Sequence, residues 1–504
     1  MTAGLVAGLV APLVGVGLTL SLRGLLRAVA GLVAAVAGTG GALMVAAAVL
    51  RTAAPGRTVV QLPLGVEVVL IADGLAAVML VTVAVVMLGV LGVAAVEDQR
   101  QPQARHVATW PLLLLLWWGL TVLFLAGDLL TIYLMLELVG ACGALLVTLR
   151  GDVASLLAGM RYFYAELAAS TTMLVGVGLV WSQTGTLVLA ELPADLGGQP
   201  TAIVGLAAIS AGLLLKVPLI PLHLWLSPAH TLAPRVVSPV LSAVMVKAAF
   251  VVLMRVWFLA VPDTVTFAAA QLLGGLGALA VLWGSLLALR SAGLKQLVAA
   301  STAAQLGLLF LLAPLVMADA PEGWTGGMVL AVAHAPAKAG MLLAAVLIVD
   351  AARLAGAETP LGTGAGSRGA GGVGTATRWP VLAGLQGTAT MRPVAVMAFG
   401  VGGLGMVGLP PSGGFVGKWY LLLGSVAVAQ WWWIAVVVLG TLLTAGYLMR
   451  VVRPAMGPPV AHAPVQRDAR DILALALASL TVMLGLWPGP LLDLLAVGAP
   501  DLGG

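Results

Sequence analysis

Runs of apolar residues, separated by short stretches that hold charges, prolines or glycine clusters, follow one another along the whole chain. An apolar helix needs about 20 residues to cross the hydrocarbon core of a bilayer. Divided at these stretches, the pattern predicts about fourteen spanning helices, at residues 3–21, 29–50, 67–96, 109–127, 128–149, 157–182, 202–226, 236–260, 266–290, 294–315, 325–352, 393–425, 430–453 and 471–493. The runs at 67–96 and 393–425 are longer than one span needs, which implies tilt or a break.

The composition leads to the same fold class. Of the 504 residues, 61% are hydrophobic and 9% are charged, and the mean hydropathy is +1.12. Soluble domains do not have such a composition. The sequence therefore predicts an all-α polytopic membrane protein in contact with the lipid bilayer, and the net charge of +5 is no sign of a nucleic-acid partner.

Metal and cofactor sites are not expected. The single cysteine, Cys142, excludes intrachain disulfides, thiolate-held iron–sulfur clusters and cysteine-based zinc sites. Few of the five histidines are spaced for haem or a metal ion, and no dinucleotide- or phosphate-binding glycine pattern follows a strand. The glycine-rich stretch 355–390 lacks a Gly-Lys-Ser/Thr sequence, so it is interpreted as a flexible cytoplasmic linker.

The arginines alternate between the two sides of the predicted spans. One set of loops is arginine-rich, and the opposite set is acidic or neutral apart from Arg51, Arg57 and Arg255. By the positive-inside rule the first set is cytoplasmic, so both termini are expected on the outer side. The rich set holds Arg23, Arg27, Arg100, Arg105, Arg150, Arg161, Arg235, Arg290, Arg353 to Arg392 and Arg450 to Arg470. The N-terminus lacks a charged leader and is interpreted as a retained first span.

The five lysines are placed differently from the arginines. Four lie within apolar runs, and Lys295 begins another run; the full set is Lys216, Lys247, Lys295, Lys338 and Lys418. A lysine can release its proton when it is buried, whereas arginine stays protonated. An ammonium at the bilayer centre costs roughly 2.5–3.5 kcal/mol on insertion scales, so five by accident would be unusual. The pattern indicates a protein that moves protons.

Two of these lysines stand beside prolines that interrupt a span. Lys216 is followed by Pro218 and Pro221, and Pro410 with Pro411 precedes Lys418. Proline removes a backbone donor and clashes with the preceding turn, so both helices are expected to break. Broken helices at membrane depth usually line an ion path. A packing kink with a snorkelling lysine is the alternative interpretation.

The other candidates are buried polar residues between the two breaks. Glu137 lies near mid-membrane with no cation in its own helix, and either pairs elsewhere or stays protonated on a backbone carbonyl. His334 and Lys338 are four residues apart and so share a helix face, which favours a relay over a purely structural histidine. Lys295 is either a relay residue or an interfacial anchor. Glu166 and Asp73 are weaker candidates.

The same stretches resemble the antiporter-like membrane subunits of respiratory complex I, membrane-bound hydrogenases and multisubunit Mrp cation/proton antiporters. The resemblance runs in family order from about residue 67 to 455. It is carried by Asp128 to Glu137, by Lys216 through His223 to His230, by Lys247 to Arg255, by Leu294 to Gly307, by His334 to Lys338 and by Gly408 to Lys418.

The resemblance implies fourteen helices with two inverted five-helix repeats. It also implies a Glu137–Lys216 pair, a relay through Lys247, Lys338 and His334, and an exit lysine at Lys418. There are two departures from the family pattern. The family usually has Pro-Asp or Pro-Glu where Ser227-Pro228 stands, and Lys418 resembles members with a lysine there but differs from complex I subunits that use a glutamate. The amino-acid sequence of the eighth span resembles hydrogenase-4-type and Mrp D-type members more than the other members of the family.

These observations together predict a proton-translocating subunit of a multisubunit energy-converting complex in a bacterial or archaeal plasma membrane. Its partners would be other membrane subunits and protons, with sodium ions as a second candidate ion. A stand-alone ion or solute transporter and a non-pumping scaffold are the alternatives. Whether the complex is a redox-driven pump or an Mrp antiporter stays open. The expected divisions are 1–108 (three N-terminal spans), 109–260 (first repeat), 261–455 (second repeat, with the linker) and 456–504 (last span).

Overall fold

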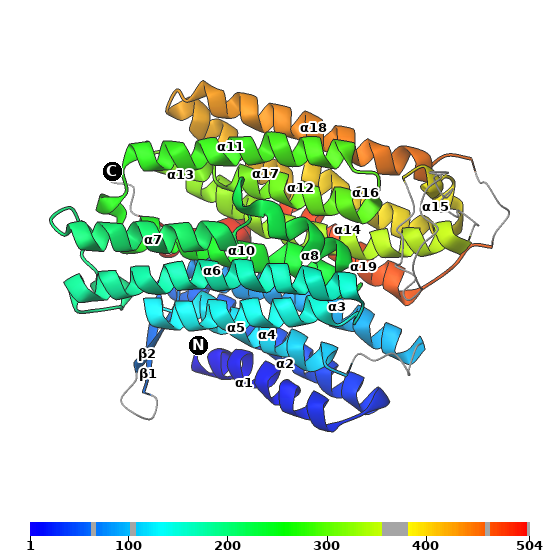
Figure 1. Cartoon of the computed structure of the whole chain (residues 1–504), viewed down its shortest axis with the longest axis horizontal. Helices are drawn as coiled ribbons and strands as arrows, with labels where there is room; N and C mark the ends of the chain where they lie inside the picture. The colour runs from blue at the N-terminus through cyan, green and yellow to red at the C-terminus, as the bar shows by residue number, and fades with distance from the viewer. Residues whose placement is uncertain (62–66, 101–106, 355–381, 459–463, 501–504) are drawn as a thin grey trace, which may run out of the picture.

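The computed structural model describes residues 1–61, 67–100, 107–354, 382–458 and 464–500. Long helices lie side by side in one bundle, with their axes nearly parallel (Figure 1). Within the described residues, eleven helices are long and apolar enough to cross a membrane, and three shorter apolar helices accompany them. The chain is an all-α polytopic membrane protein, as predicted. The total of fourteen spans and the two inverted repeats stay predictions.

The first half of the chain contains most of the bundle's rim and one small sheet. Its elements are α1 (Thr2–Ser21), α2 (Gly24–Thr52), β1 (Gly56–Gln61), β2 (Glu67–Ala72), α3 (Gly74–Arg100), α4 (Thr109–Leu125), α5 (Leu129–Thr148), α6 (Val153–Thr184), η2 (Leu189–Glu191), α7 (Pro200–Lys216), η3 (Leu222–Trp225), α8 (Leu226–Leu232), α9 (Val237–Val240), η4 (Leu241–Met245), α10 (Val246–Arg255), η5 (Val256–Ala260) and η6 (Pro262–Thr264). The stretch from α9 to η5 is one continuous span in which η4 and η5 are π-helical turns.

The second half supplies two of the three completely buried spans and the opposite rim of the bundle. Its elements are α11 (Phe267–Arg290), α12 (Leu294–Leu309), α13 (Leu312–Val316), α14 (Pro321–Leu354), η7 (Leu382–Leu385), α15 (Thr388–Met391), α16 (Pro393–Val407), α17 (Gly413–Ala427), α18 (Trp431–Ala455), α19 (Ala469–Leu486) and α20 (Gly489–Ala496).

A β-hairpin replaces the start of one predicted helix. The run from residue 67 was expected to be helical, but β2 pairs antiparallel with β1, with Val59 opposite Val69. The β-branched residues of both segments favour this extended structure. The helix begins only at Gly74, where Asp73 accepts a hydrogen bond from the Ala76 amide at 2.7 Å. The helical prediction for 67–73 was therefore wrong, and the strand accounts for the first part of this long run.

Both predicted helix breaks are present. α7 ends at Lys216, and the chain turns through Pro218 and Pro221 before η3 and α8. α16 ends at Val407, and α17 begins at Gly413, after the turn that holds Pro410 and Pro411. The single last span expected at 471–493 is divided too, because α19 ends at Leu486 and α20 begins at Gly489.

The predicted linker 355–390 lies only in part within the described residues. Residues 355–381 are outside them. The last part of the stretch forms the short helices η7 and α15, so it is not the flexible linker that was predicted there.

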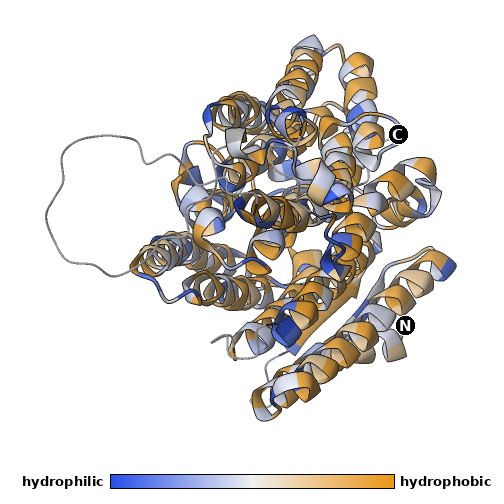
Figure 2. Ribbon diagram, turned by 90° about the vertical axis from the view of Figure 1, so that its right-hand side faces the viewer, coloured by the Kyte–Doolittle hydropathy of each residue, from blue (hydrophilic) through white to orange (hydrophobic). Residues whose placement is uncertain are grey.

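The three spans at the centre of the bundle carry three of the five buried lysines, Lys247, Lys295 and Lys338. The most apolar windows of Val237–Ala260, Leu294–Val316 and Pro321–Leu354 are completely buried, whereas those of α1 and α18 are one-third buried. Helices are therefore stacked around this centre, and an end-on view shows hydrophobic residues covering most of them (Figure 2). Close approach in lipid depends on small residues. Gly176 of α6 and Gly205 of α7, for example, leave no room for side chains between them.

The two ends of the bundle differ in charge. The hairpin lies at one end and α15 at the other (Figure 1). Val497, just after α20, accepts a hydrogen bond from Gly74 at the hairpin end, at 2.9 Å. At the other end, a hollow of about 670 Å³ is lined by arginines from six different segments, Arg100, Arg150, Arg235, Arg353, Arg392 and Arg470. These six predicted cytoplasmic arginines thus share one end of the molecule.

A candidate proton path of buried lysines

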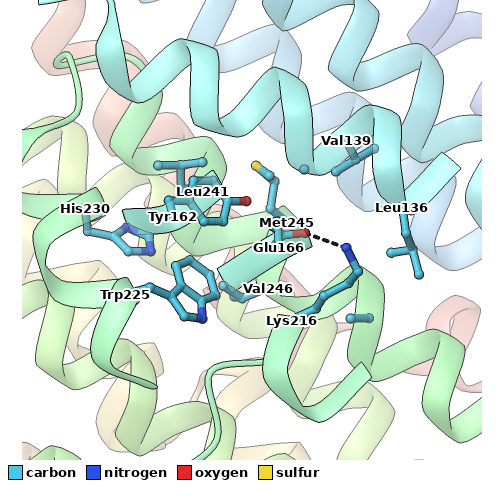
Figure 3. Close-up of a pocket in the computed structure, with 12 residues that line it drawn as sticks. Leu136, Val139, Tyr162, Glu166, Lys216, Trp225, His230, Leu241, Met245 and Val246 are labelled. Carbon is cyan, nitrogen blue, oxygen red and sulfur yellow. Dashed lines mark hydrogen bonds and ion pairs between the residues drawn. The ribbon is translucent and has the colours of Figure 1, made fainter. Parts of the chain in front are cut away.

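Lys216 lies between two carboxylates in the first broken helix. Its Nζ donates to Glu166 Oε2 at 2.6 Å and lies 3.7 Å from Glu137 Oε1. The Lys216 and Glu166 side chains are 4% and 11% exposed, whereas that of Glu137 is 36% exposed. The sequence pointed to Glu137 as the partner and placed Glu166 among the weaker candidates. In this structure Glu166 makes the shorter contact (Figure 3).

The Lys216–Glu166 pair borders a small cavity. The cavity measures about 20 Å³, enough for a water molecule. His230 and Tyr162 also line it, and Tyr162 stacks on Trp225 with ring centroids 4.6 Å apart (Figure 3). The Trp225 indole donates to the Leu215 carbonyl at 3.1 Å, which satisfies one group that the break in α7 leaves free. The ion pair and His230 of α8 thus line the same small cavity.

Lys247 is completely buried in the central span. Its Nζ donates to the carbonyls of Ala243 at 2.7 Å and Ser242 at 3.2 Å. Both carbonyls belong to the π-helical turn η4, where the usual backbone pairing is interrupted. Ser242 also shares a 2.8 Å hydrogen bond with Thr302 of α12. The π turn therefore provides the acceptors that make a buried ammonium tolerable at this position.

Lys338 and His334 lie on the central helix α14. Lys338 Nζ donates to Ser301 Oγ of α12 at 2.5 Å, and its residue is completely buried. His334 is also buried, and among the described residues no hydrogen-bond partner contacts either of its ring nitrogens. Pro336, between the two, frees the carbonyl one turn earlier. An imidazole with open nitrogens beside a lysine suits proton exchange.

Lys418 caps the second broken helix. Its Nζ donates to the carbonyls of Val407 at 2.7 Å and Met406 at 3.3 Å, the last residues of α16, and to Thr441 Oγ1 at 3.0 Å. The end of α16 leaves these carbonyls without helical partners. A positive charge is stabilised there because the C-terminal end of a helix carries a partial negative charge. The break at Pro410 and Pro411 and the lysine thus form one unit.

Lys295 faces the arginine-rich end. Its Nζ donates to the Ala233 carbonyl at 2.6 Å. Ala233 is one of the residues that line the 670 Å³ hollow. Lys295 is 4% exposed, so it lies just beneath the hollow, between the polar end and the central lysines. This position is compatible with both roles that the sequence left open.

Three secondary candidates have different surroundings. Asp128 caps α5, because its Oδ1 accepts from the Thr131 amide at 2.7 Å, which gives it a structural contact. His230 is buried beside the Lys216 cavity, and neither of its ring nitrogens has a partner among the described residues. His223 is half-buried in η3, away from the cavity lining.

Some polar groups of the site could not be found as candidates by sequence reasoning. Four hydroxyl residues contact the buried lysines or their partners, yet nothing in their own sequence neighbourhood distinguishes them from ordinary hydroxyls of a spanning helix: Tyr162, Ser242, Thr302 and Tyr447. Arg255 was assigned to an outer loop, but it is buried and pairs with Asp73 at 2.9 Å. Its prediction as a loop residue was wrong. A charge inside the run 236–260 was the available signal, since such charges seek a partner.

No metal centre is evident in the described ranges. No group of three or more His, Cys, Asp or Glu side chains in them is placed to hold a metal ion. The buried groups of the site that can carry positive charge are lysine side chains, which donate to carbonyls, hydroxyls and a carboxylate of the protein.

Comparisons with known proteins agree with this geometry. Residues 126–444 match the family model described as "NADH:quinone oxidoreductase/Mrp antiporter, TM". The "NADH-quinone oxidoreductase subunit N" of Desulforudis audaxviator is 31% identical over 397 residues, which is 78% of this chain and 73% of that protein. The matched region, residues 126–444, contains all five buried lysines.

Two solved structures share the fold. A chain of the archaeal membrane-bound sulfane sulfur reductase has a TM-score of 0.83 at 23% identity, covering 99% of this chain and 97% of that one. A chain of the Mrp complex from Dietzia sp. DQ12-45-1b has a TM-score of 0.81 at 22% identity, covering 100% and 98%. The chain described here belongs to the NADH:quinone oxidoreductase/Mrp antiporter transmembrane family, as an antiporter-like membrane subunit.

Proposed function

We propose that this chain translocates protons as one subunit of a multisubunit energy-converting complex. The observation that carries the proposal is the series of buried lysines from Lys216 to Lys418, each held by a carboxylate, a hydroxyl or carbonyls freed by a break or a π turn. A fixed structural charge would be served by arginine, whereas every one of these positions holds a residue that can release its proton.

The pair at Lys216 is the proposed switch. Two carboxylates compete for one ammonium, at 2.6 Å and 3.7 Å. A movement that draws both away leaves the ammonium without a counter-charge in an apolar site, which favours release of its proton. The proton then passes toward Lys247, Lys338 with His334, and Lys418. Return of the carboxylate favours reprotonation of Lys216.

Other membrane subunits are the proposed drivers of this switch. The Glu137 side chain is 36% exposed at the surface of a spanning helix. An ionised carboxylate that faces lipid is costly, so a neighbouring protein surface is the better cover. Subunits of complexes named for NADH:quinone oxidoreduction, sulfane sulfur reduction and Mrp antiport share this fold, and any of these driving reactions fits. Sodium as a second ion is proposed only for the Mrp case.

The remaining features follow from the same proposal. The arginine-rich end is placed at the cytoplasm, which puts both termini outside. The membrane is proposed to be a bacterial or archaeal plasma membrane. The chain itself is proposed to hold no redox cofactor and no metal, so electrons would travel through other subunits.

Lys216→Ala in the assembled complex tests the function. We expect proton uptake into vesicles, normalised to assembled complex, to be lost, because no group can then alternate between Glu166 and the central lysines. Arg290→Ala, at an exposed helix end, is the control. Near-normal uptake by the lysine variant would rule out the proposal and favour a scaffold. Transport by the isolated chain in liposomes would favour a stand-alone transporter.

A further inference from the structure

α18 has three hydroxyl residues, and they share one face. Thr441, Thr444 and Tyr447 are spaced three residues apart, so neighbouring members are about one turn apart and the row slants across one side of the helix. Thr444 and Tyr447 are buried and Thr441 is half-buried, whereas the other face exposes Leu439, Leu442 and Met449. A rim helix of this membrane protein thus turns all of its hydroxyl groups inward.

The cytoplasm-side member of this row reaches the surroundings of Lys338. Tyr447 is completely buried, and its hydroxyl lies within hydrogen-bonding reach of Ser301, the acceptor of the Lys338 ammonium. Gln305 Nε2 donates to Thr444 Oγ1 at 3.1 Å and contacts the Tyr447 hydroxyl at 3.5 Å. The amide therefore fixes both hydroxyls with respect to α12, which carries Ser301.

The other end of the row reaches Lys418. Thr441 Oγ1 accepts from Lys418 Nζ at 3.0 Å. Along a helix, the six residues from Thr441 to Tyr447 correspond to about 9 Å, with Thr444 halfway. The row therefore covers the interval between Lys338 of α14 and Lys418 of α17. Among the described residues, no hydrogen bond joins these two lysines directly.

We propose that α18 forms the polar wall through which a proton passes from Lys338 to Lys418. Tyr447 is a positioning residue that holds Ser301, and through it Lys338, while Thr441 holds Lys418. A proton released by Lys338 then meets hydroxyl groups rather than hydrocarbon on its way, and each hydroxyl is neutral before and after the transfer. This inference rests on the proposed function. It gives α18, which carries no charged residue in the membrane interior, a part in the proton path.

Few charged groups face this stretch of α18. Lys418 approaches from α17, and Lys338 from α14 through Ser301. Lys295 of α12 and Arg290 of α11 lie at the helix ends near the arginine-rich side. Arg450 of α18 itself donates to the carbonyls of Ala288 and Leu289 at the end of α11. A change in the pH profile after an α18 substitution can therefore be assigned to Lys338 or Lys418.

The experiment compares Tyr447→Phe, Thr441→Val and the double variant in the assembled complex. Tyr164→Phe and Thr171→Val, on the exposed face of α6, are the matched controls. Phenylalanine keeps the packed ring, so Tyr447→Phe removes the hydroxyl alone. We expect about a tenfold fall in proton translocation for each single variant, the usual scale for one buried hydrogen bond, and a displaced pH–rate profile. The double variant should fall by less than the product of the singles, because both act on one step.

Lys338→Ala, measured in parallel, separates the two proposals. If Lys338→Ala stops translocation while Tyr447→Phe and Thr441→Val match their controls in rate and pH profile, the role of α18 is overturned and the proposed function stands. If Lys338→Ala translocates normally, the proposed function fails, and the α18 path with it. If Tyr447→Phe does not assemble, Thr441→Val decides: a control-like rate and pH profile overturn the path.

Discussion

At the scale of single residues, the choice of counter-ion for Lys216 carries the sharpest consequence. Glu166 is nearly buried and makes the 2.6 Å contact, and Glu137 is more exposed at 3.7 Å. The two carboxylates are on different helices, α6 and α5, so they can exchange the lysine when those helices move. Which of them matters more is a question that substitution can answer.

We expect Glu166→Gln to reduce proton translocation more strongly than Glu137→Gln. Removal of one partner of a buried ion pair costs about 3–5 kcal/mol, and an exposed partner contributes far less. Each variant should also be non-additive with Lys216→Met, since independent sites add within about 0.3–0.5 kcal/mol. Glu322→Gln, in the first turn of α14, is the control. A larger effect of Glu137→Gln would mean that the working pair differs from the one seen here.

Lys247→Arg should be nearly as damaging to translocation as Lys247→Ala. Arginine keeps the positive charge but does not release its proton, and the carbonyls of η4 are spaced for a single ammonium. Lys247→His should retain partial, pH-dependent transport. The measurement is proton uptake per assembled complex across a range of pH, with Arg290→Lys as the control. Normal pumping by Lys247→Arg would show that this position only sets the local potential.

The residues that sequence reasoning identified are those whose chemistry is conspicuous within one run. A lysine in an apolar span, or two prolines beside it, is visible without knowledge of the fold. The partners are not visible in this way. Glu166 contacts Lys216 only because α6 packs against α7, and Ser301 contacts Lys338 only because α12 packs against α14. Spacing along one helix does not contain that information.

At the scale of elements, the least expected features are those where the backbone departs from a plain helix. The prolines predicted the breaks after α7 and α16, because a proline lacks the backbone N–H that its own helical turn needs. The π turns η4 and η5 contain no proline and no glycine, so nothing local predicts them. The strand β2 was hidden because its apolar residues continue without interruption into the apolar run of α3. A hairpin becomes the better choice only when its two segments pair.

The ion pair between Asp73 and Arg255 joins the start of α3 to α10. The two side chains are 8% and 6% exposed and lie 2.9 Å apart. We expect Asp73→Asn to lower the unfolding free energy by about 3–5 kcal/mol, because the arginine then stays buried without its counter-charge. Asparagine can still cap α3. Thermal unfolding in detergent measures the change, and Glu67→Gln in the hairpin is the control.

The double variant Asp73→Leu/Arg255→Leu should be closer to the parent than Asp73→Asn is, since well-packed apolar residues often replace a buried pair at little cost. Equal stability of the parent and Asp73→Asn would show that this pair does not hold the two helices together.

At the scale of the whole molecule, the arginine-rich end is fastened by an ionic cluster around Asp468. This carboxylate receives Arg100 at 2.7 Å, Arg470 at 2.7 Å and Arg392 at 3.2 Å. Burial alone would raise the pKa of Asp468, but hydrogen bonds from Arg470 and from Arg392 outweigh it and hold the pKa well below its usual range. The cluster connects the ends of α3, α16 and α19.

The stability of this end should therefore depend on pH on the acidic side. A carboxyl whose pKa is depressed in the folded state stabilises fully above its unfolded pKa of about 3.9, and this contribution is lost as the pH falls toward the folded value. We expect the parent to lose thermal stability as the pH falls below about 4, and Asp468→Asn to be less stable at pH 7 with a weaker dependence. Asp493→Asn in α20 is the control. Parallel curves for parent and Asp468→Asn would assign the acid sensitivity to other groups.

The general architecture was accessible from the sequence because the bilayer imposes it. Every apolar run of sufficient length must satisfy its backbone internally, and a helix is the solution open to a single segment. The segregation of the arginines also follows from local composition. The arrangement of central and peripheral helices does not follow from local composition, since α14 and α18 have similar apolar character. Only the packing decides which of the two helices contacts lipid.

The depth of the lysines has an electrical consequence. Lys247 and Lys338 lie near the middle of their spans, and Lys216 and Lys418 lie at breaks within theirs. A charge that moves between groups at similar depth does not travel along the field across the membrane, which is worth about 2.3 kcal/mol per charge per 100 mV over the full thickness. Voltage would therefore act on the steps between each surface and the lysines and leave the lateral steps unchanged. A transport rate that loses its voltage dependence in one variant would identify the residue that governs access from a surface.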